Sequence, residues 1–283
     1  MALIARREWF MKLKKKSIES LSGWYKTQSG QATLTKLDEQ CAEVLSEIFG
    51  YYAVEMGVLS GQHSLLQQTR IATSFTLIDK AGSNLLSIKP KKRIEGDQLE
   101  TFSTLISSNE QLPLATDNID LVLGTHVLEL SKDPHQVLRE IDRVLVPEGH
   151  CILIGFNPFA ISGLADQLRS KILRKKEPFE LRSASRIRDW FSLLGFEVLD
   201  VHYMGLRPNV KSKKLFDSLS KLENWGEIAG PLLGKLYMIH AKKQVVAMTP
   251  YKKVWRAPAV LSGGKVVLNN TAQKVRRENY SNY

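Results

Sequence analysis

The sequence predicts an α/β fold in which a mostly parallel sheet carries helices on both faces. Two observations support this class. From residue 33 onward, apolar runs typical of strands alternate with segments that have helical periodicity. The stretch 110–157 then contains a strand, a capped amphipathic helix and a second strand in direct succession. Such strand–helix–strand units are typical of parallel sheets, and with 283 residues, 43% of them apolar, the chain can form a large core.

In the first half of the chain the sequence predicts two helices and three strands. Helical spacing of apolar residues predicts a helix over 33–49, with Thr35 and Asp38 as a capping box at its start. Residues 80–100 are polar and basic, so we expect loops there with at most one short helix. The other elements expected in this half are strands at 51–56, 74–78 and 101–106 and a short helix at 64–68.

In the second half, the clearest element is a helix over 134–145. Asp133 is a good N-cap, and Pro134 stands in the first turn, where proline is tolerated. A helix over 185–194 ends at Gly195, as a C-cap would. The remaining expectations are strands at 119–124, 150–156, 196–203, 236–241 and 245–248, a helix at 212–225, and an irregular basic segment at 157–182.

Charge divides the chain into three parts. The net charge is +11, and residues 250–283 carry +6 of it, with seven Lys and Arg residues against Glu278 alone. We therefore expect a basic N-terminal arm at 1–30, a domain at 31–249 whose core motif region is 79–157, and a basic, flexible tail at 250–283. The arm is interpreted as a loosely docked terminal segment with room for a short surface helix, and a peripheral membrane-surface anchor is the alternative.

No apolar run reaches the ~18 residues that a membrane span needs, and charges interrupt the N-terminal apolar stretches that a signal peptide would require. These features predict a cytoplasmic protein. Cys41 and Cys151 stand 110 positions apart without metal-ligand spacing, so both are expected to be reduced, buried thiols, and no metal is expected.

Within 110–157 the sequence contains Leu112-Pro113-Leu114, Ile119-Asp120-Leu121-Val122, His126-Val127-Leu128-Glu129 and Val144-Leu145-Val146-Pro147-Glu148-Gly149. In this order the motifs resemble the class I S-adenosylmethionine (SAM)-dependent methyltransferases of the type 11 domain family. Gly155-Phe156-Asn157-Pro158-Phe159 resembles a bacterial subgroup of that family whose substrate is not established. The resemblance implies a Rossmann-like, seven-stranded sheet with its last strand antiparallel, SAM as the cofactor, and transfer of a methyl group to an acceptor.

The turn after the first strand is the first candidate cofactor site, because ligands of open α/β sheets bind beyond the carboxyl ends of the strands. Glu55, Gly57 and Gly61 match the family's acidic residue and two of its glycines, whereas Leu59 replaces the middle glycine. The side chain of Leu59 either points into the junction of sheet and helix or blocks SAM. Two glycines after a strand are also typical of a purely structural turn.

The next candidates follow the second and third strands. Asp79 lies 22 positions beyond Gly57, close to the spacing of an acid that binds ribose hydroxyls, although an exposed strand-end Asp is the alternative. Where the family has an Asp that holds the adenine amino group, this chain has Ser108 followed by Asn109. Leu112 is also assigned to the cofactor site from the resemblance.

The loop after the fourth strand contains Thr125, His126 and Glu129, and in the family this loop passes the methionine part of SAM. Thr125 is therefore expected at the cofactor. His126 is the candidate general base, because imidazole titrates near neutral pH; a loop histidine that orients the next helix is the alternative. Asn157 and Phe159 follow the fifth strand and are expected near the substrate, although Phe159 would equally suit a buried aromatic position.

Three functions are compatible with these patterns. The first is a methyltransferase that acts on a small-molecule or unknown acceptor. The second is a methyltransferase-like binding protein that has lost SAM or catalysis, which Leu59 and Ser108 favour. The third is an RNA-directed methyltransferase or binding protein that uses the basic tail or the basic run at 169–182, although such runs are more commonly solvated surface.

Overall fold

The computed structural model describes residues 2–60, 62–80, 92–95, 98–101, 103–160, 180–205, 231 and 234–244. The predicted helix at 212–225, the strand at 245–248 and the tail at 250–283 lie outside the described residues, and so does the basic run from 169 to 179. None of the described helices is long and apolar enough to cross a bilayer.

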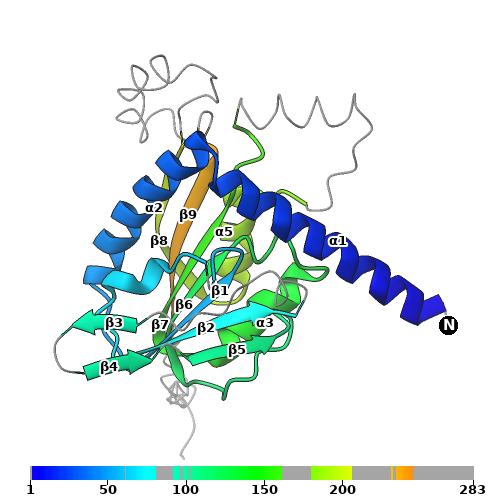
Figure 1. Cartoon of the computed structure of the whole chain (residues 1–283). Coiled ribbons are helices and arrows are strands. Elements are labelled where there is room, and N and C mark those ends of the chain that lie inside the picture. Colours follow the sequence, from blue (N-terminus) through cyan, green and yellow to red (C-terminus); the bar gives the residue numbers. More distant parts are fainter. Residues whose placement is uncertain are drawn as a thin grey trace, which may run out of the picture. The chain divides into compact units, whose positions relative to one another are not determined.

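The core of the domain is a seven-stranded sheet with the order β5-β2-β1-β6-β7-β9-β8 (Figure 1). β9 runs antiparallel to both of its neighbours, and the other pairs are parallel, which confirms the predicted sheet. The strands are β1 Tyr52–Gly57, β2 Thr73–Asp79, β5 Ser103–Ser107, β6 Ile119–Thr125, β7 Leu145–Phe156, β8 Phe196–Met204 and β9 Leu236–Lys243.

Strand order reverses at β1. The chain first builds outward on one side, through β2 and β5, and then returns to pair β6 with the other side of β1. In open α/β sheets such a reversal is where the loops at the carboxyl ends diverge and leave room for a ligand. The topology therefore directs attention to the residues that follow β1, β2, β5 and β6.

Helices cover both faces of the sheet. α2 (Gln28–Ser46) and the short helix η1 (Leu65–Gln68) pack on one face, in an apolar cluster that includes Leu121. α3 (Pro134–Val144) and α5 (Ala184–Leu193) pack on the other face, in a cluster that includes Val122. Adjacent residues of β6 serve opposite faces because side chains alternate along a strand.

Helix ends follow the expected capping chemistry in two places. Asp133 accepts a hydrogen bond from the backbone N–H of Gln136 (3.0 Å), and Gly195 has a positive φ of 81° beyond α5. The capping box predicted at Thr35 is wrong, because α2 begins seven residues earlier at Gln28. Its N-cap is Thr27, whose hydroxyl oxygen accepts from the N–H of Gly30 (3.1 Å).

Two further expectations are corrected by the backbone. Residues 80–100 were expected to be loops with at most one short helix, but 92–95 and 98–101 form the antiparallel pair β3 (Lys92–Glu95) and β4 (Gln98–Thr101). Gly-Asp is the dipeptide between these strands, a type that two-residue hairpin connections favour. The strand expected from 150 begins at Leu145, and its register against β6 shifts between Ile119 and Leu121, so that residues 146–149 form a bulge inside β7.

The N-terminal arm is the largest correction. It forms α1 (Ala2–Tyr25), a 24-residue helix that runs along one side of the sheet toward α2 (Figure 1). The expectation of a loosely docked arm is wrong for its second half, where one face is buried: Lys14, Ser17, Ile18, Leu21 and Tyr25. Gly30 lets α2 approach α1, since a Cβ there would lie 2.1 Å from the carbonyl oxygen of Trp24.

The pair His150 and His240 predicts that stability falls with acid. Their rings share a hydrogen bond of 2.8 Å between Nδ1 and Nε2. Burial, followed by the neighbouring His150, lowers the pKa of His240 to about 4 from 6.5, and burial also lowers the pKa of His150. The unfolded chain therefore binds protons first as the pH falls below about 6.5. We expect the free energy of unfolding to decrease between pH 6.5 and 4, measured by urea denaturation.

The matched test is His240→Asn, which should flatten this pH dependence because it removes one group that titrates differently in the two states. His135→Asn, at an exposed position of α3, is the control and should leave the slope unchanged. An equal slope for the wild-type protein and His240→Asn would contradict the assignment.

Candidate active site

The site is organised by the close approach of β1 and β6 at their carboxyl ends. Gly57 has a φ of 111°, and a Cβ on it would lie 1.9 Å from the carbonyl oxygen of Thr125. The Thr125 hydroxyl accepts from the N–H of Leu59 (3.1 Å) and donates to the carbonyl of Met56 (3.3 Å). Gly57 is thus required by strand packing, and the Thr125 side chain fastens the turn; a contact of either with a cofactor stays a prediction.

Leu59 points away from the strand-end loops. It is buried and belongs to the apolar cluster that α2 and η1 form over the sheet, together with Leu65 and Ile71. Of the two positions considered for this side chain, the structure therefore shows the one in the junction of sheet and helix. Leu59 does not fill the site, and Gly61 lies outside the described residues.

Glu55 stabilises the turn that follows β1. Its buried carboxylate accepts hydrogen bonds from the Ser64 hydroxyl (2.8 Å) and from the N–H of Leu65 (3.1 Å), at the start of η1. Anionic groups are favourable at such helix starts, where backbone N–H groups lack partners. The observed role of Glu55 is structural, and its contact with a cofactor stays a prediction.

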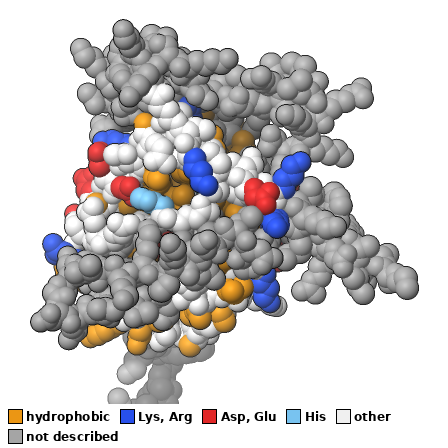
Figure 2. Space-filling model, viewed as in Figure 1, with side chains coloured by type: hydrophobic (Ala, Val, Ile, Leu, Met, Phe, Trp, Pro, Cys, Tyr) orange, Lys and Arg blue, Asp and Glu red, His pale blue; other side chains and the backbone are white. Residues whose placement is uncertain are grey.

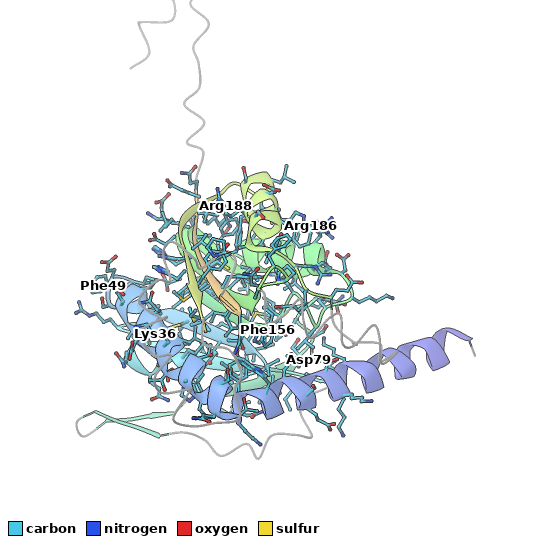
Figure 3. The ribbon with its side chains drawn as sticks, turned by 90° about the horizontal axis from the view of Figure 1, so that it is seen from above. Lys36, Phe49, Asp79, Phe156, Arg186 and Arg188 are labelled. Carbon is cyan, nitrogen blue, oxygen red and sulfur yellow. The ribbon has the colours of Figure 1, made fainter. Side chains whose placement is uncertain are left out.

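Asp79 ends β2 and is paired with a lysine from α1. The Lys14 ammonium lies 2.7 Å from Oδ2 of Asp79, and both side chains are buried, with exposed fractions of 5% and 8%. The alternative of an exposed strand-end Asp is therefore excluded. Figure 3 shows Asp79 and Phe156 on the side of the sheet along which α1 runs.

The segment after β5 forms a tight turn. Ser108 accepts from the N–H of Gln111 through its carbonyl (3.1 Å) and from the N–H of Glu110 through its hydroxyl (3.3 Å). This turn buries Asn109. Leu112 lies in the apolar core, and its N–H donates to Glu140 of α3 (2.9 Å), so the backbone on both sides of Asn109 is held in place.

Two buried polar atoms have no partner among the described residues, namely Oγ of Ser60 and Oδ1 of Asn109. Ser60 follows Leu59 in the turn after β1, and Asn109 lies in the turn after β5. Buried polar side chains are hydrogen-bonded in the large majority of cases, so each unpartnered atom requires an explanation. Both turns are at the carboxyl edge where the topology places a ligand.

His126 lies in a fully buried group of side chains after β6. Its Nε2 is 2.7 Å from the Tyr25 hydroxyl, and its Nδ1 is 3.3 Å from Oε1 of Glu129. Phe156 stacks on the imidazole, with ring centroids 4.6 Å apart. His126 also has a positive φ of 56°, and its N–H donates to the carbonyl of Ile154 (2.8 Å). The imidazole is therefore fixed in position by its contacts with Tyr25, Glu129 and Phe156.

The two residues expected at the substrate behave differently. Asn157 is buried, and its amide donates to the carbonyls of Pro231 (2.8 Å) and Gly234 (3.0 Å), so it fastens the end of β7 to the segment before β9. Phe159 is 61% exposed, which excludes the buried aromatic alternative. Contact of either residue with a substrate stays a prediction.

Sequence reasoning missed Lys14 and Tyr25, although a signal was present. Positions 14, 18, 21 and 25 share one face of a helix, and on α1 that face is buried. Ile18 and Leu21 pack with Val58 and Leu130, which follow β1 and β6. α1 therefore lies over the strand ends and supplies two polar side chains to the site.

Among the described residues no three His, Cys, Asp or Glu side chains converge as a metal site would require. On the face drawn in Figure 2, the described Lys and Arg side chains are scattered, with acidic and apolar side chains between them. Nucleic-acid interfaces have clustered basic residues instead.

Comparison with known proteins shows one matching family model, the methyltransferase domain, over residues 54–153. The uncharacterised protein YafS of Escherichia coli is 35% identical over 154 residues, which are 53% of this chain and 59% of YafS. A malonyl-[acyl-carrier protein] O-methyltransferase of Alcanivorax borkumensis is 25% identical over 142 residues, 50% of this chain and 46% of that protein. The chain thus spans about half the length of the curated relatives it matches.

Solved structures share the fold at low sequence identity. A SAM-dependent methyltransferase of Thermotoga maritima, described as a possible histamine N-methyltransferase, has a TM-score of 0.57 and 18% identity and covers 83% of this chain and 100% of its own. A methyltransferase solved with the Trm112 methyltransferase activator of Haloferax volcanii has a TM-score of 0.52 and 16% identity. The match covers 80% of this chain and 98% of that methyltransferase chain.

The position of Leu59 leads to a stability prediction. Leu59→Ala should lower the free energy of unfolding by about 2–5 kcal/mol, because it removes a buried side chain and leaves a cavity against η1. Urea denaturation measures the change, and Leu193→Ala, at an 84% exposed position of α5, is the control. A loss no greater than that of the control would show that Leu59 is not part of the core.

Proposed function

We propose that the chain transfers a methyl group from SAM to an acceptor. Residues 54–153 match the methyltransferase domain model, and the sheet has the fold of solved SAM-dependent methyltransferases, and both findings support the proposal. The proposed acceptor is a small molecule or another nucleophile. The observation that carries the proposal is the pair of unpartnered atoms at Ser60 and Asn109.

A bound cofactor explains both atoms. An unsatisfied buried polar group costs about 1–3 kcal/mol, so a ligand that bonds to it recovers free energy that the empty protein lacks. The Asn109 oxygen is an acceptor in the turn where the family holds the adenine amino group, which is a donor. The Ser60 hydroxyl can donate or accept, and it follows the turn after β1. The residues present therefore fit an adenosyl ligand.

Asp79 is the group proposed to hold the ribose. A carboxylate accepts up to about four hydrogen bonds, which suits two neighbouring hydroxyls. Lys14 already contacts Oδ2 of Asp79, so a ribose either joins this ion pair or replaces Lys14. In both cases α1 borders the cofactor.

When bound, SAM supplies a methyl group on a sulfonium, which a nucleophile takes by in-line displacement. The chain's contribution is alignment and exclusion of water, for which the buried strand-end turns are suited. An acceptor that carries a proton also requires a base, and His126 is the residue proposed for that role. Its Nε2 can take a proton only after the Tyr25 hydroxyl has moved away.

A second candidate function is a binding protein of this fold without catalysis. The observation that favours it is the occupation of Asp79 by Lys14 and of His126 by Tyr25. RNA-directed function has no such support in the described part of the chain. Titration with S-adenosylhomocysteine and SAM separates the enzyme from a binding protein that has lost SAM, and an assay of methyl transfer separates it from one that has lost only catalysis. An RNA shift assay at rising salt tests the third candidate, since phosphate contacts weaken steeply with salt.

The sharpest test uses Ser60→Ala and Asn109→Ala in calorimetric titrations with S-adenosylhomocysteine. Each variant should bind roughly 2- to 10-fold more weakly, because it loses a hydrogen bond to the ligand. Loss of the Ser60 hydroxyl should not lower stability in urea, because Oγ of Ser60 and Oδ1 of Asn109 have no partner among the described residues.

Ser46→Ala is the matched control, since Ser46 is exposed at the end of α2 and bonds only the carbonyl of Glu43 among its described contacts. It should leave the affinity unchanged. Absence of binding by the wild-type chain would overturn the proposed function, whereas binding that both variants retain in full would overturn the assignment of these two residues.

A further inference from the structure

We propose that Tyr25 is a positioning residue of the site: its hydroxyl holds His126 in the tautomer that carries its proton on Nδ1, and so directs the basic Nε2 toward α1. The inference rests on the proposed function for its catalytic meaning, because His126 is the proposed base. Its geometry is independent of any cofactor, because all the contacts belong to the chain itself.

The direction of the first hydrogen bond follows from the chemistry of Tyr25. Its hydroxyl oxygen lies 2.7 Å from Nε2 of His126, and the side chain is buried. Burial, followed by the negative charge of Glu129, raises the pKa of Tyr25 well above 10. The phenol therefore stays protonated near neutral pH and can donate to Nε2. Because the carboxylate of Glu129 opposite Nδ1 can only accept, we infer that Nε2 is the acceptor.

The second hydrogen bond follows from the first. A neutral imidazole has one N–H donor and one acceptor nitrogen, so an acceptor Nε2 leaves the proton on Nδ1. Nδ1 lies 3.3 Å from Oε1 of Glu129. The same oxygen accepts from the N–H of Phe156 (2.8 Å), which fixes the carboxylate. The contacts form one chain, from Tyr25 through His126 to Glu129.

Aromatic side chains around the imidazole of His126 hold its ring plane in place. Phe156 stacks on the ring at 4.6 Å, and Trp24, the neighbour of Tyr25 on α1, packs edge-on against Phe156 at 5.0 Å. With the ring plane fixed, the group placed opposite Nε2 decides which nitrogen is the acceptor. Tyr25 is that group.

This arrangement has a consequence for access to the site. The lone pair of Nε2 points at the last turn of α1. A methyl acceptor that gives its proton to His126 must therefore reach the position of the Tyr25 hydroxyl. α1 ends at Tyr25, and Thr27 begins the cap of α2 two residues later. The junction of α1 and α2 therefore forms the wall of the acceptor site next to the base.

The test is ¹⁵N NMR of the ligand-free full chain labelled at histidine. The chain has six histidines, and His126→Gln identifies the signal of His126. In the wild-type protein at pH 7.5, Nδ1 of His126 should show the shift of a protonated ring nitrogen and Nε2 that of an unprotonated one. Tyr25→Phe keeps the aromatic ring and should lower the ratio of the Nδ1–H to the Nε2–H tautomer roughly tenfold, because Nε2 loses its buried donor.

Two controls separate positioning from a structural effect. Tyr51→Phe makes the same chemical change at a 75% exposed position before β1 and should leave the His126 spectrum unchanged. Glu129→Gln keeps Tyr25 in place and should retain the Nδ1–H tautomer. Loss of stability alone, without a change of tautomer, would indicate a purely structural role for Tyr25.

Three outcomes overturn the proposal: a wild-type His126 with its proton on Nε2, a tautomer ratio unchanged in Tyr25→Phe, or a ratio that only Glu129→Gln alters. The wild-type spectrum is decisive even if a variant does not fold. None of these results depends on cofactor binding, so failure of this inference is distinguishable from failure of the proposed function, which the S-adenosylhomocysteine titration tests.

Discussion

The constraint on which the site depends is the contact between Gly57 and Thr125 at the ends of β1 and β6. With no room for a Cβ at Gly57, the two backbones meet, and the Thr125 hydroxyl is drawn into the turn between them. This geometry turns Leu59 into the core and brings His126 out of β6 with a positive φ. The turn after β1 resembles a cofactor-binding loop, but its observed contacts join the ends of β1 and β6.

The sheet could be predicted because its signals are local. Apolar runs ending at Gly57 or Asp79 mark strands, and Asp133 with Pro134 marks a helix start, without reference to the rest of the chain. The antiparallel position of β9 followed from family resemblance, since periodicity contains no information on strand direction. The β3–β4 pair was missed because the polar composition of 80–100 outweighed a two-residue hairpin signal.

The candidate site was only partly predictable, because its decisive contacts join distant residues. Asp79 was proposed as a cofactor residue from its spacing, but its partner Lys14 lies 65 positions away, and Tyr25 lies 101 positions from His126. Burial of a lysine and a tyrosine on α1 is a tertiary property that the basic composition of 1–30 concealed. Thr125 and Asn157 were expected to face ligands, yet their side chains bond to backbone groups. Residue type alone does not distinguish these two uses.

α1 links the two halves of the proposed chemistry. One helix face carries Lys14 to the group proposed for the cofactor and Tyr25 to the proposed base, with Ile18 and Leu21 packed between them. A ligand that binds Asp79 or His126 must displace the contact with Lys14 or Tyr25. Its apparent affinity is therefore reduced in proportion to the fraction of protein molecules in which that contact is already broken. Exchange of one hydrogen bond for another at the Asp79 carboxylate costs little, whereas separation of the apolar face from Val58 and Leu130 exposes surface to water. Cofactor exchange at Lys14 with α1 still docked is therefore cheaper than removal of the whole helix, and access to Nε2 requires the Tyr25 hydroxyl to leave its position.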